Sequence, residues 1–191
     1  MKNSENPIYN PWKTIESEQI YDNPWIHVRE DKVVNPGGGE GIYGVVHFKN
    51  TAIGIIPLDD EQNTWIVGQH RYPLDEYSWE IPMGGAPAGT TPLEGGMREL
   101  REETGISAAR WHELMKIHTS NSVTDEIGYV FVATDLSFGE WAPEESEELI
   151  VRRIPFVDAV DMVLNNSITD GISIAAILRL NVALNSGELT C

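Results

Sequence analysis

Cysteine is almost absent from this sequence. Its 191 residues include one cysteine, Cys191, at the last position. A single thiol excludes an internal disulfide framework and a cysteine-based zinc site, because each needs more than one cysteine. The five histidines lack H-E-x-x-H spacing, and neither a G-x-S-x-G elbow nor a G-x-x-x-x-G-K-[ST] loop occurs. We therefore exclude these zinc, serine-nucleophile and P-loop classes of site.

Basic side chains are also scarce. The chain has 13 Lys and Arg against 30 Asp and Glu, which gives a formal net charge of −17. Nucleic acids and anionic membranes are bound through a basic surface, so we expect neither as a partner. A phosphate-bearing ligand has to be met by metal ions and a few local arginines. The start, MKNSENPIYNPW, is polar and no long apolar run follows, which predicts a soluble, cytoplasmic protein.

The stretch 84–106, GGAPAGTTPLEGGMRELREETGI, carries the clearest chemical pattern. Glu99, Glu102 and Glu103 have i, i+3 and i+4 spacing, so on a helix they share one face. Three converging carboxylates call for a cation, and Mg²⁺ and Mn²⁺ prefer carboxylate oxygens and water. The alternative is a solvated acidic helix face on which Arg98 pairs with Glu102 across one turn.

Residues 98–106, RELREETGI, resemble the end of the Nudix box, G-x5-E-x7-R-E-U-x-E-E-x-G-U, in which U is aliphatic. Gly84 occupies the first glycine of that pattern. One position departs from it, because Thr90 stands where the family has its first glutamate. This departure concerns an auxiliary carboxylate and leaves the three helical glutamates in place.

The resemblance implies a set of roles for residues of the box. Glu99, Glu102 and Glu103 would ligate Mg²⁺, or alternatively Mn²⁺, together with the carbonyl of Met83, and Glu103 is also a catalytic candidate. Arg98 would orient the glutamates through hydrogen bonds, with contact to phosphate as the alternative. Gly84 and Gly105 would be structural, Gly105 as the stop of the helix.

The resemblance and the hydrophobic pattern together predict an α+β fold. We expect the α/β/α sandwich of the Nudix family, with a mixed β-sheet between helices and a small N-terminal β-meander. Residues 1–47 would form an arm and a β unit, and residues 48–191 the Nudix hydrolase domain. The pattern predicts strands at 16–21, 24–34, 42–48, 52–58, 65–69, 111–119 and 127–134, with 52–58 and 65–69 as the central hairpin, and helices at 92–104, 155–165 and 174–184.

Two segments upstream of the box also resemble family motifs. Residues 67–73, VGQHRYP, match V-x-Q-x-R-x-P, and residues 78–82, SWEIP, match W-E-x-P. Arg71 is a candidate clamp for phosphate or ribose, because a guanidinium offers a planar fork of donors; a surface salt bridge to Asp75 or Glu76 is its alternative. Glu80 could accept from a base or a ribose hydroxyl, or could face solvent.

Further candidates lie outside these motifs. Trp25 is a stacking candidate for the base. Segment 119–126, TSNSVTDE, resembles the S-P-G-x-x-x-E loop of ADP-ribose pyrophosphatases, with Glu126 as its acidic residue, although its Pro and Gly are replaced. In the acidic segment 140–151, EWAPEESEELIV, Glu145 or Glu147 would act as the base or as a further metal ligand, with a solvated acidic loop as the alternative.

The implied activity is metal-assisted hydrolysis of a diphosphate. We expect the substrate to be ADP-ribose or another nucleotide sugar, cleaved to a nucleoside monophosphate and a sugar phosphate. A dinucleotide, a coenzyme or a nucleoside triphosphate is the nearer alternative, and a non-catalytic nucleotide-binding module is the more distant one. The N-terminal β unit would join a two-fold homodimer and lend residues to the partner's site, or else cover the main sheet of its own chain.

Overall fold

The computed structural model describes residues 9–139 and 149–189. Its strands are β1 (Lys13–Asp22), β2 (Ile26–Val34), β3 (Glu40–Phe48), β4 (Thr51–Pro57), β5 (Asn63–Arg71), β6 (Glu76–Glu80), β7 (Met83–Ala86), β8 (Ile106–His118), β9 (Ile127–Phe138) and β10 (Ile150–Pro155). Its helices are α1 (Pro92–Thr104), α2 (Phe156–Leu164) and α3 (Gly171–Ser186). Within the described residues, no helix combines the length and apolar character needed to span a lipid bilayer.

The chain divides into two compact units. The first comprises Met1–Lys49 and Ser120–Asp125, and the second comprises Asn50–Thr119 and Glu126–Cys191. In the first unit, β1, β2 and β3 form an antiparallel meander in that order, which confirms the predicted N-terminal β-meander. Segment 120–125 joins it through a parallel bridge from Thr124 to Val46.

The meander buries little apolar surface by itself. Every residue of β1 is exposed, and Val33 is the one hydrophobic side chain of the three strands that is buried. Asp31 is buried too and accepts from Ser17 Oγ at 2.6 Å and from Arg29 Nε at 3.1 Å. The large apolar side chains of this unit that are more than half exposed include Ile15, Ile20, Trp25 and Ile42. Considered alone, the unit therefore leaves an apolar surface open to solvent.

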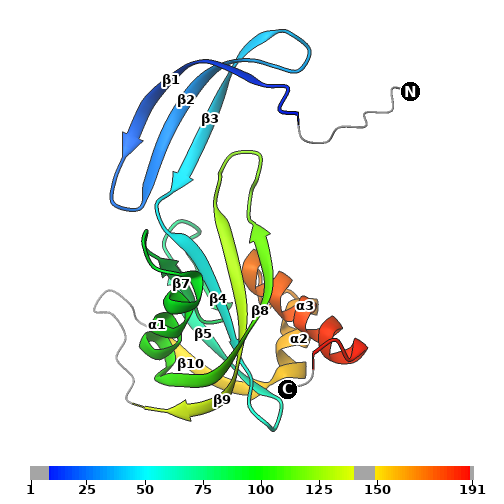
Figure 1. Ribbon diagram of the computed structural model, residues 1–191. Coiled ribbons are helices and arrows are strands. Elements are labelled where there is room, and N and C mark those ends of the chain that lie inside the picture. The colour runs from blue at the N-terminus through cyan, green and yellow to red at the C-terminus, as the bar shows by residue number, and fades with distance from the viewer. Residues whose placement is uncertain (1–8, 140–148, 190–191) are drawn as a thin grey trace. The chain divides into compact units, whose positions relative to one another are not determined.

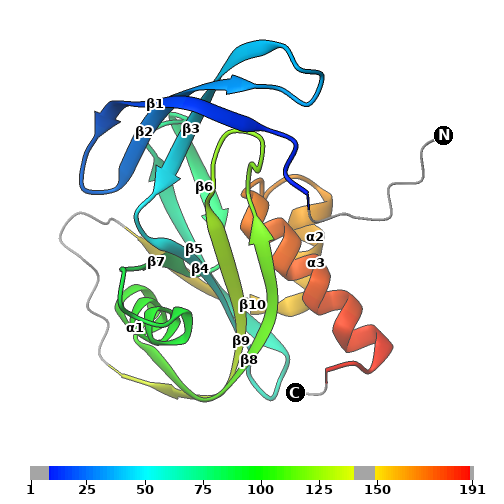
Figure 2. The same cartoon turned by 45° about the horizontal axis from the view of Figure 1, so that its top comes forward.

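The second unit is a mixed β structure covered by helices on both sides. One sheet has the order β7-β4-β9-β8, with β4 and β9 parallel, and the other has the order β10-β5-β6. Side chains of β4 alternate between two cores, because successive residues of a strand point to opposite faces. Ile53 and Ile55 lie in the core that contains Leu100 of α1, and Ile56 lies in the core formed with α2 and α3. Figure 1 shows α1 on one side of the strands and α2 with α3 on the other, and Figure 2 shows the same arrangement from a second angle. The predicted α/β/α sandwich is confirmed.

One predicted pairing is wrong. The sequence suggests that β4 and β5 form the central hairpin of one sheet, but they belong to different sheets. A strand has two hydrogen-bonding edges, and those of β4 are occupied by β7 and β9. What remains of the hairpin is an isolated bridge between Leu58 and Thr64. Neighbours in sequence therefore separate here because distant strands take both edges of β4.

Local sequence signals define α1 closely. Thr91 is the N-cap and forms a capping box with Glu94, Pro92 follows in the first turn, and Gly105 ends the helix with a φ of 71°. These are the signals that favour a helix over residues 92–104, which is the observed range. A Cβ on Gly95 would lie 2.7 Å from Ala86 Cβ and 3.2 Å from Ala86 Cα. This glycine therefore lets α1 approach β7 closely.

Gly95→Ala is expected to destabilise the protein although alanine favours helices. The helical gain is about 1 kcal/mol, whereas forcing a methyl group against a strand backbone typically costs about 1–3 kcal/mol. Gly96→Ala is the matched control, because its new Cβ would meet a side chain, Ile53 Cγ2, at 3.3 Å. Urea denaturation should give Gly95→Ala a lower free energy of unfolding than wild type, and Gly96→Ala an equal or higher one. An equal increase in the free energy of unfolding of both variants would contradict the close packing at Gly95.

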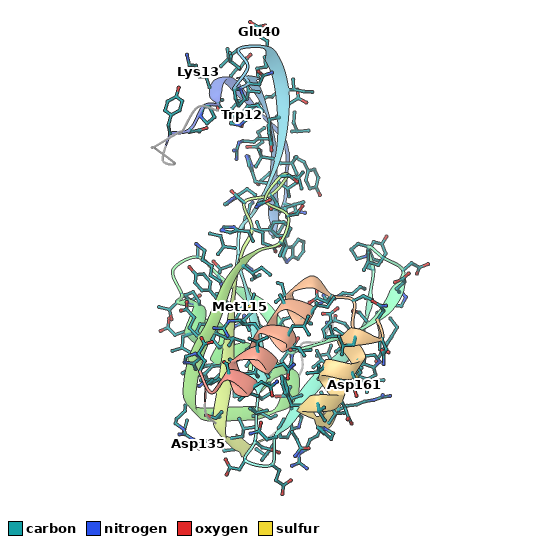
Figure 3. All side chains as sticks on the ribbon, turned by 90° about the vertical axis from the view of Figure 1, so that its right-hand side faces the viewer. Trp12, Lys13, Glu40, Met115, Asp135 and Asp161 are labelled. Carbon is teal, nitrogen blue, oxygen red and sulfur yellow. The ribbon has the colours of Figure 1, made fainter. Side chains whose placement is uncertain are left out.

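The last two helices cover the second face of the strands. Figure 3 shows this side of the unit, with Met115 of β8 and with Asp161 on α2; Met115 packs against the core that α2 and α3 share. Helix α3 begins at Gly171, three residues before the predicted start at 174, because Asp170 acts as its N-cap and accepts from the Ser173 N–H at 2.7 Å. Ser173 Oγ in turn accepts from the Ile81 N–H at 3.0 Å. These two bonds tie the start of α3 to the strand region.

Candidate active site

The acidic face of α1 lies against the segment Met83–Gly85. Glu99 Oε1 accepts from the Gly85 N–H at 3.0 Å, and Glu103 Oε2 accepts from the Met83 N–H at 2.9 Å. Both bonds come from residues on one helical face and reach one short strand, β7. These two backbone donors, Met83 and Gly85, therefore fix where the two carboxylates point.

Arg98 connects the same groups from the side. Its guanidinium forms ion pairs with Glu99 and Glu102 and donates to the Gly85 carbonyl at 2.9 Å. A single planar group thus bridges two of the three helical carboxylates and the backbone of β7. This is the geometry of a residue that orients the glutamates.

Gly84 has no room for a side chain. A Cβ built on it would overlap the carboxyl group of Glu99, so Glu99 can keep its present position against β7 only with glycine there. Glu99 is mostly buried, and this burial raises the pKa of its carboxyl group, while the neighbouring Arg98 guanidinium opposes the shift. Burial therefore disfavours the ionised form of Glu99 although the Arg98 cation is its direct partner.

The donor set fits a hard divalent cation. Glu99, Glu102 and Glu103 present carboxylate oxygens from one helical face, the ligand type that Mg²⁺ and Mn²⁺ prefer. Within the described ranges, however, no group of three or more His, Cys, Asp or Glu side chains lies close enough to hold a metal as it stands. Glu99 and Glu102 form ion pairs with Arg98. Glu103 accepts a hydrogen bond from the Met83 N–H. Holding a metal would therefore require these side chains to turn away from their present partners.

Arg71 and Glu80 form a partly buried ion pair. Arg71 Nε donates to Glu80 Oε1 at 2.8 Å, and its Nη2 contacts the other carboxylate oxygen. Glu80 is 2% exposed, so the alternative that it faces solvent is wrong. The suggested salt bridge from Arg71 to Asp75 or Glu76 is also wrong. The buried Glu80 carboxylate requires a cation, whereas Asp75 and Glu76 are exposed and can be solvated by water. The hydrogen bond to Glu80 raises the pKa of Arg71.

Removing the cation of this pair is expected to be costly. Arg71→Met should lower the free energy of unfolding by about 3 kcal/mol, because it leaves the Glu80 carboxylate unpaired in the interior. Replacing both residues with methionine should recover most of that loss, since apolar side chains often substitute for a buried pair without penalty. Urea denaturation of the single and double variants measures the difference. If the double variant is as unstable as Arg71→Met, the ion pair is not the cause.

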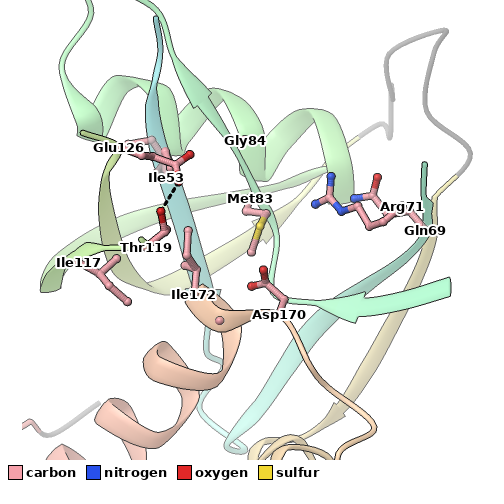
Figure 4. A pocket seen from close by; sticks show the side chains of 12 residues that line it. Ile53, Gln69, Arg71, Met83, Gly84, Ile117, Thr119, Glu126, Asp170 and Ile172 are labelled. Atoms are coloured by element: carbon pink, nitrogen blue, oxygen red, sulfur yellow. Dashed lines mark hydrogen bonds between the residues drawn. The ribbon is translucent and has the colours of Figure 1, made fainter. Parts of the chain in front are cut away.

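A pocket of about 690 Å³ opens beside these groups. Its polar lining includes Gln69, Arg71, Glu126 and Asp170, and Met83 and Gly84 contribute to its wall. Figure 4 shows Arg71 and Gln69 on one side and Ile117 and Thr119 on the other, with Asp170 directed inward below Met83. Thr119 Oγ1 donates to the carboxylate of Glu126. The pocket therefore has the Arg71 guanidinium on one side, apolar side chains such as Ile117 on the other, and in its wall the strand β7, which is hydrogen-bonded to α1.

The structure gathers most of the residues suggested by the sequence. Four of them line the pocket itself: Arg71, Met83, Gly84 and Glu126. Others are hydrogen-bonded directly behind that lining: Glu80, Arg98, Glu99 and Glu103. Trp25 belongs to the first unit, where it is 67% exposed. Glu145 and Glu147 lie outside the described residues.

Asp170 and Gln69 were not among the residues suggested by the sequence. Asp170 sits at the start of α3 and reaches the pocket because Ser173 anchors that helix start to Ile81. An aspartate followed by an apolar helix is a recognisable N-cap signal, but it carries no information on what the carboxylate faces. Gln69 lies two residues before Arg71 on β5, and strand alternation alone predicts that these two side chains share a face.

Comparison with known proteins adds five similarities. Residues 12–46 match the model of the nucleoside diphosphate sugar hydrolase N-terminal domain, and residues 48–171 match that of the NUDIX domain. The chain is 34% identical over 174 residues to ADP-ribose pyrophosphatase of Mycobacterium tuberculosis, spanning 89% of this chain and 83% of that protein. It is 33% identical over 178 residues to ADP-ribose pyrophosphatase of Bacillus subtilis, spanning 91% and 96%. Its fold resembles a crystal structure of an ADP compounds hydrolase with a TM-score of 0.83 at 19% identity, over 92% of this chain and 95% of the other.

Proposed function

Because the chain belongs to the Nudix family, we propose that it hydrolyses the diphosphate linkage of ADP-ribose or another nucleotide sugar to a nucleoside monophosphate and a sugar phosphate. The chain is a Nudix pyrophosphohydrolase. The observation that carries the substrate class is the pocket in which Arg71 lies beside the backbone anchored by Glu99 and Glu103. A diphosphate needs this pairing of a guanidinium with a metal-binding carboxylate set. The relatives named ADP-ribose pyrophosphatase support the same class.

Catalysis in this family depends on a divalent metal, and we propose Mg²⁺, with Mn²⁺ as a substitute. Glu99, Glu102 and Glu103 would hold it with the Met83 carbonyl. When bound, the metal supplies charge against the diphosphate and lowers the pKa of a coordinated water. Arg98 keeps the glutamates in place until then, through its contacts with Glu99 and Glu102.

The remaining roles concern the substrate and the proton. We propose that Arg71 binds a phosphate oxygen while Glu80 fixes the plane of its guanidinium. Glu126, on the pocket lining, would accept from a hydroxyl or amino group of the ligand. Trp25 as a stacking residue, and Glu145 or Glu147 as the base that takes the proton of the water, stay predictions from the sequence.

We also propose that the protein is a homodimer assembled through the β1-β2-β3 meander. Its support is the apolar surface of that unit, on which Ile15, Ile20, Trp25 and Ile42 are more than half exposed. An apolar surface of this kind on a thin sheet is stabilised by a covering partner. Light scattering coupled to gel filtration should give twice the chain mass, and Ile20→Lys together with Ile42→Lys should shift it to the monomer. A wild-type protein that runs as a monomer at micromolar concentration would contradict the proposal.

A substrate panel tests the proposed activity. Purified protein is incubated with ADP-ribose, other nucleotide sugars, dinucleotides, coenzymes and nucleoside triphosphates, with and without Mg²⁺, and the products are separated by chromatography. The expected result is AMP and ribose phosphate from ADP-ribose in the presence of Mg²⁺. Preference for a dinucleotide or a triphosphate would replace the proposed substrate class, and binding without any cleavage would favour a non-catalytic module.

A further inference from the structure

Asp170 holds a carboxylate in the pocket that the reaction as described leaves unused. It is the N-cap of α3, and its Oδ2 accepts from the Ser173 N–H at 2.7 Å. That bond occupies one carboxylate oxygen and fixes the side chain, because the helix behind it is anchored by the bond from Ile81 to Ser173. The other oxygen of Asp170 is left to face the cavity into which Figure 4 shows the group directed.

Asp170 and Arg71 stand at the boundary between two cavities. Both residues line the pocket of about 690 Å³, and both also line a second cavity of about 240 Å³. The smaller cavity adds the hydroxyl-bearing Ser78 and Thr169 and the Glu80 carboxylate. Pro73 and Leu74 form the apolar part of its wall. A ligand whose diphosphate lies near Gly84 and Met83 would therefore place its outer group beside the Asp170 carboxylate and these hydroxyls, against that apolar wall.

The charges of this lining disfavour a further phosphate. Among the described residues that line the two cavities, Arg71 is the only Lys, Arg or His, and its guanidinium is already paired with Glu80. Asp170 contributes an electrostatic interaction with the same guanidinium. With Arg71 engaged by the diphosphate, a third phosphate beside Asp170 would face like charge without a second cation in the lining, whereas a sugar hydroxyl would donate to the carboxylate.

We propose that Asp170 determines substrate specificity by accepting a hydroxyl of the outer sugar and repelling an outer phosphate. This inference rests on the proposed function, because it assumes a diphosphate bound between Arg71 and the acidic face of α1. Asp170 would thereby set the relative affinity of the site for a nucleoside diphosphate sugar and a nucleoside triphosphate. The selectivity would come from both attraction and repulsion at the same position.

Asp170→Asn is the decisive variant, because asparagine also caps helices and keeps the acceptor for Ser173 while removing the charge. Asp170→Ser repeats the change with another good N-cap, and Asp161→Asn removes one exposed negative charge of α2 as the control. Calorimetry without metal gives the dissociation constants of ADP-ribose and ATP for each protein, so no turnover is needed. In parallel, kcat/KM for ADP-ribose is measured with Mg²⁺.

In wild type, ADP-ribose should bind more tightly than ATP. The preference should fall about tenfold or more in Asp170→Asn and Asp170→Ser, and should be unchanged in Asp161→Asn. A preference that is the same in wild type and both Asp170 variants overturns the inference, as does a wild type that binds neither nucleotide. If the preference shifts as expected but wild type cleaves nothing, the specificity role stands and the proposed hydrolysis fails.

Discussion

Glu103→Gln is expected to lower kcat by about 10³-fold, within the range found when a group acting directly on the reaction is removed. Glu103 is 2% exposed and its Oε2 accepts from the Met83 N–H at 2.9 Å. Glutamine has nearly the same shape and can still accept that bond, so the fold should persist. What is lost is the negative charge that would hold a divalent metal beside the diphosphate.

The measurement is steady-state kinetics with ADP-ribose over a range of Mg²⁺ concentrations, with the melting temperature of each variant recorded. Glu113→Gln serves as the control, because Glu113 is an exposed glutamate of β8 outside the pocket lining. It should retain wild-type kcat. A kcat of Glu103→Gln within a few-fold of wild type would show that Glu103 has no direct role in the reaction.

Gly84→Ala is expected to lower kcat/KM by about 10²-fold, the cost that a displacement of about 1 Å can impose on a reacting group. Its added methyl group would occupy the space of the Glu99 carboxyl group. That carboxyl is the end of a flexible side chain, so it can move aside and leave the fold intact. The carboxylate would then lose both its place and its bond to the Gly85 N–H.

Gly85→Ala is the matched control for this substitution. Its new Cβ would lie 3.1 Å from the side chain of Asn50 and would meet no glutamate of α1. We expect Gly85→Ala to keep kcat/KM within a few-fold of wild type, measured with ADP-ribose under the same conditions. Equal losses in the two variants would mean that the glycines act through the backbone of β7 and that the overlap with Glu99 is irrelevant.

The fold was predictable wherever the signal is local. The cap at Thr91, Pro92 in the first turn and Gly105 at the end define α1 without reference to the rest of the chain. The pairing of β4 was not predictable in this way. Its partners β7 and β9 lie far along the sequence, and nothing in residues 52–69 excludes the hairpin that these partners prevent.

In the candidate site, too, local patterns could be predicted and contacts between distant residues could not. Residues of one motif, such as Glu99 and Glu103, could be identified because helical spacing fixes their common face. The partner of Arg71 could not, because proximity in sequence favours Asp75 and Glu76 whereas burial selects Glu80. Asp170 could not be identified from the sequence either. It is distant from Arg71 in sequence, and only the packing of α3 brings it to the same pocket.

Phosphorus NMR of ADP-ribose incubated with the protein tests the central claim most directly, because it observes the diphosphate bond itself. With Mg²⁺ present, the two diphosphate signals should be replaced by two phosphomonoester signals, from AMP and ribose phosphate. Chelation of the metal should stop the conversion. Diphosphate signals that persist with Mg²⁺ and active protein, for ADP-ribose and for every other nucleotide sugar tried, would contradict the account.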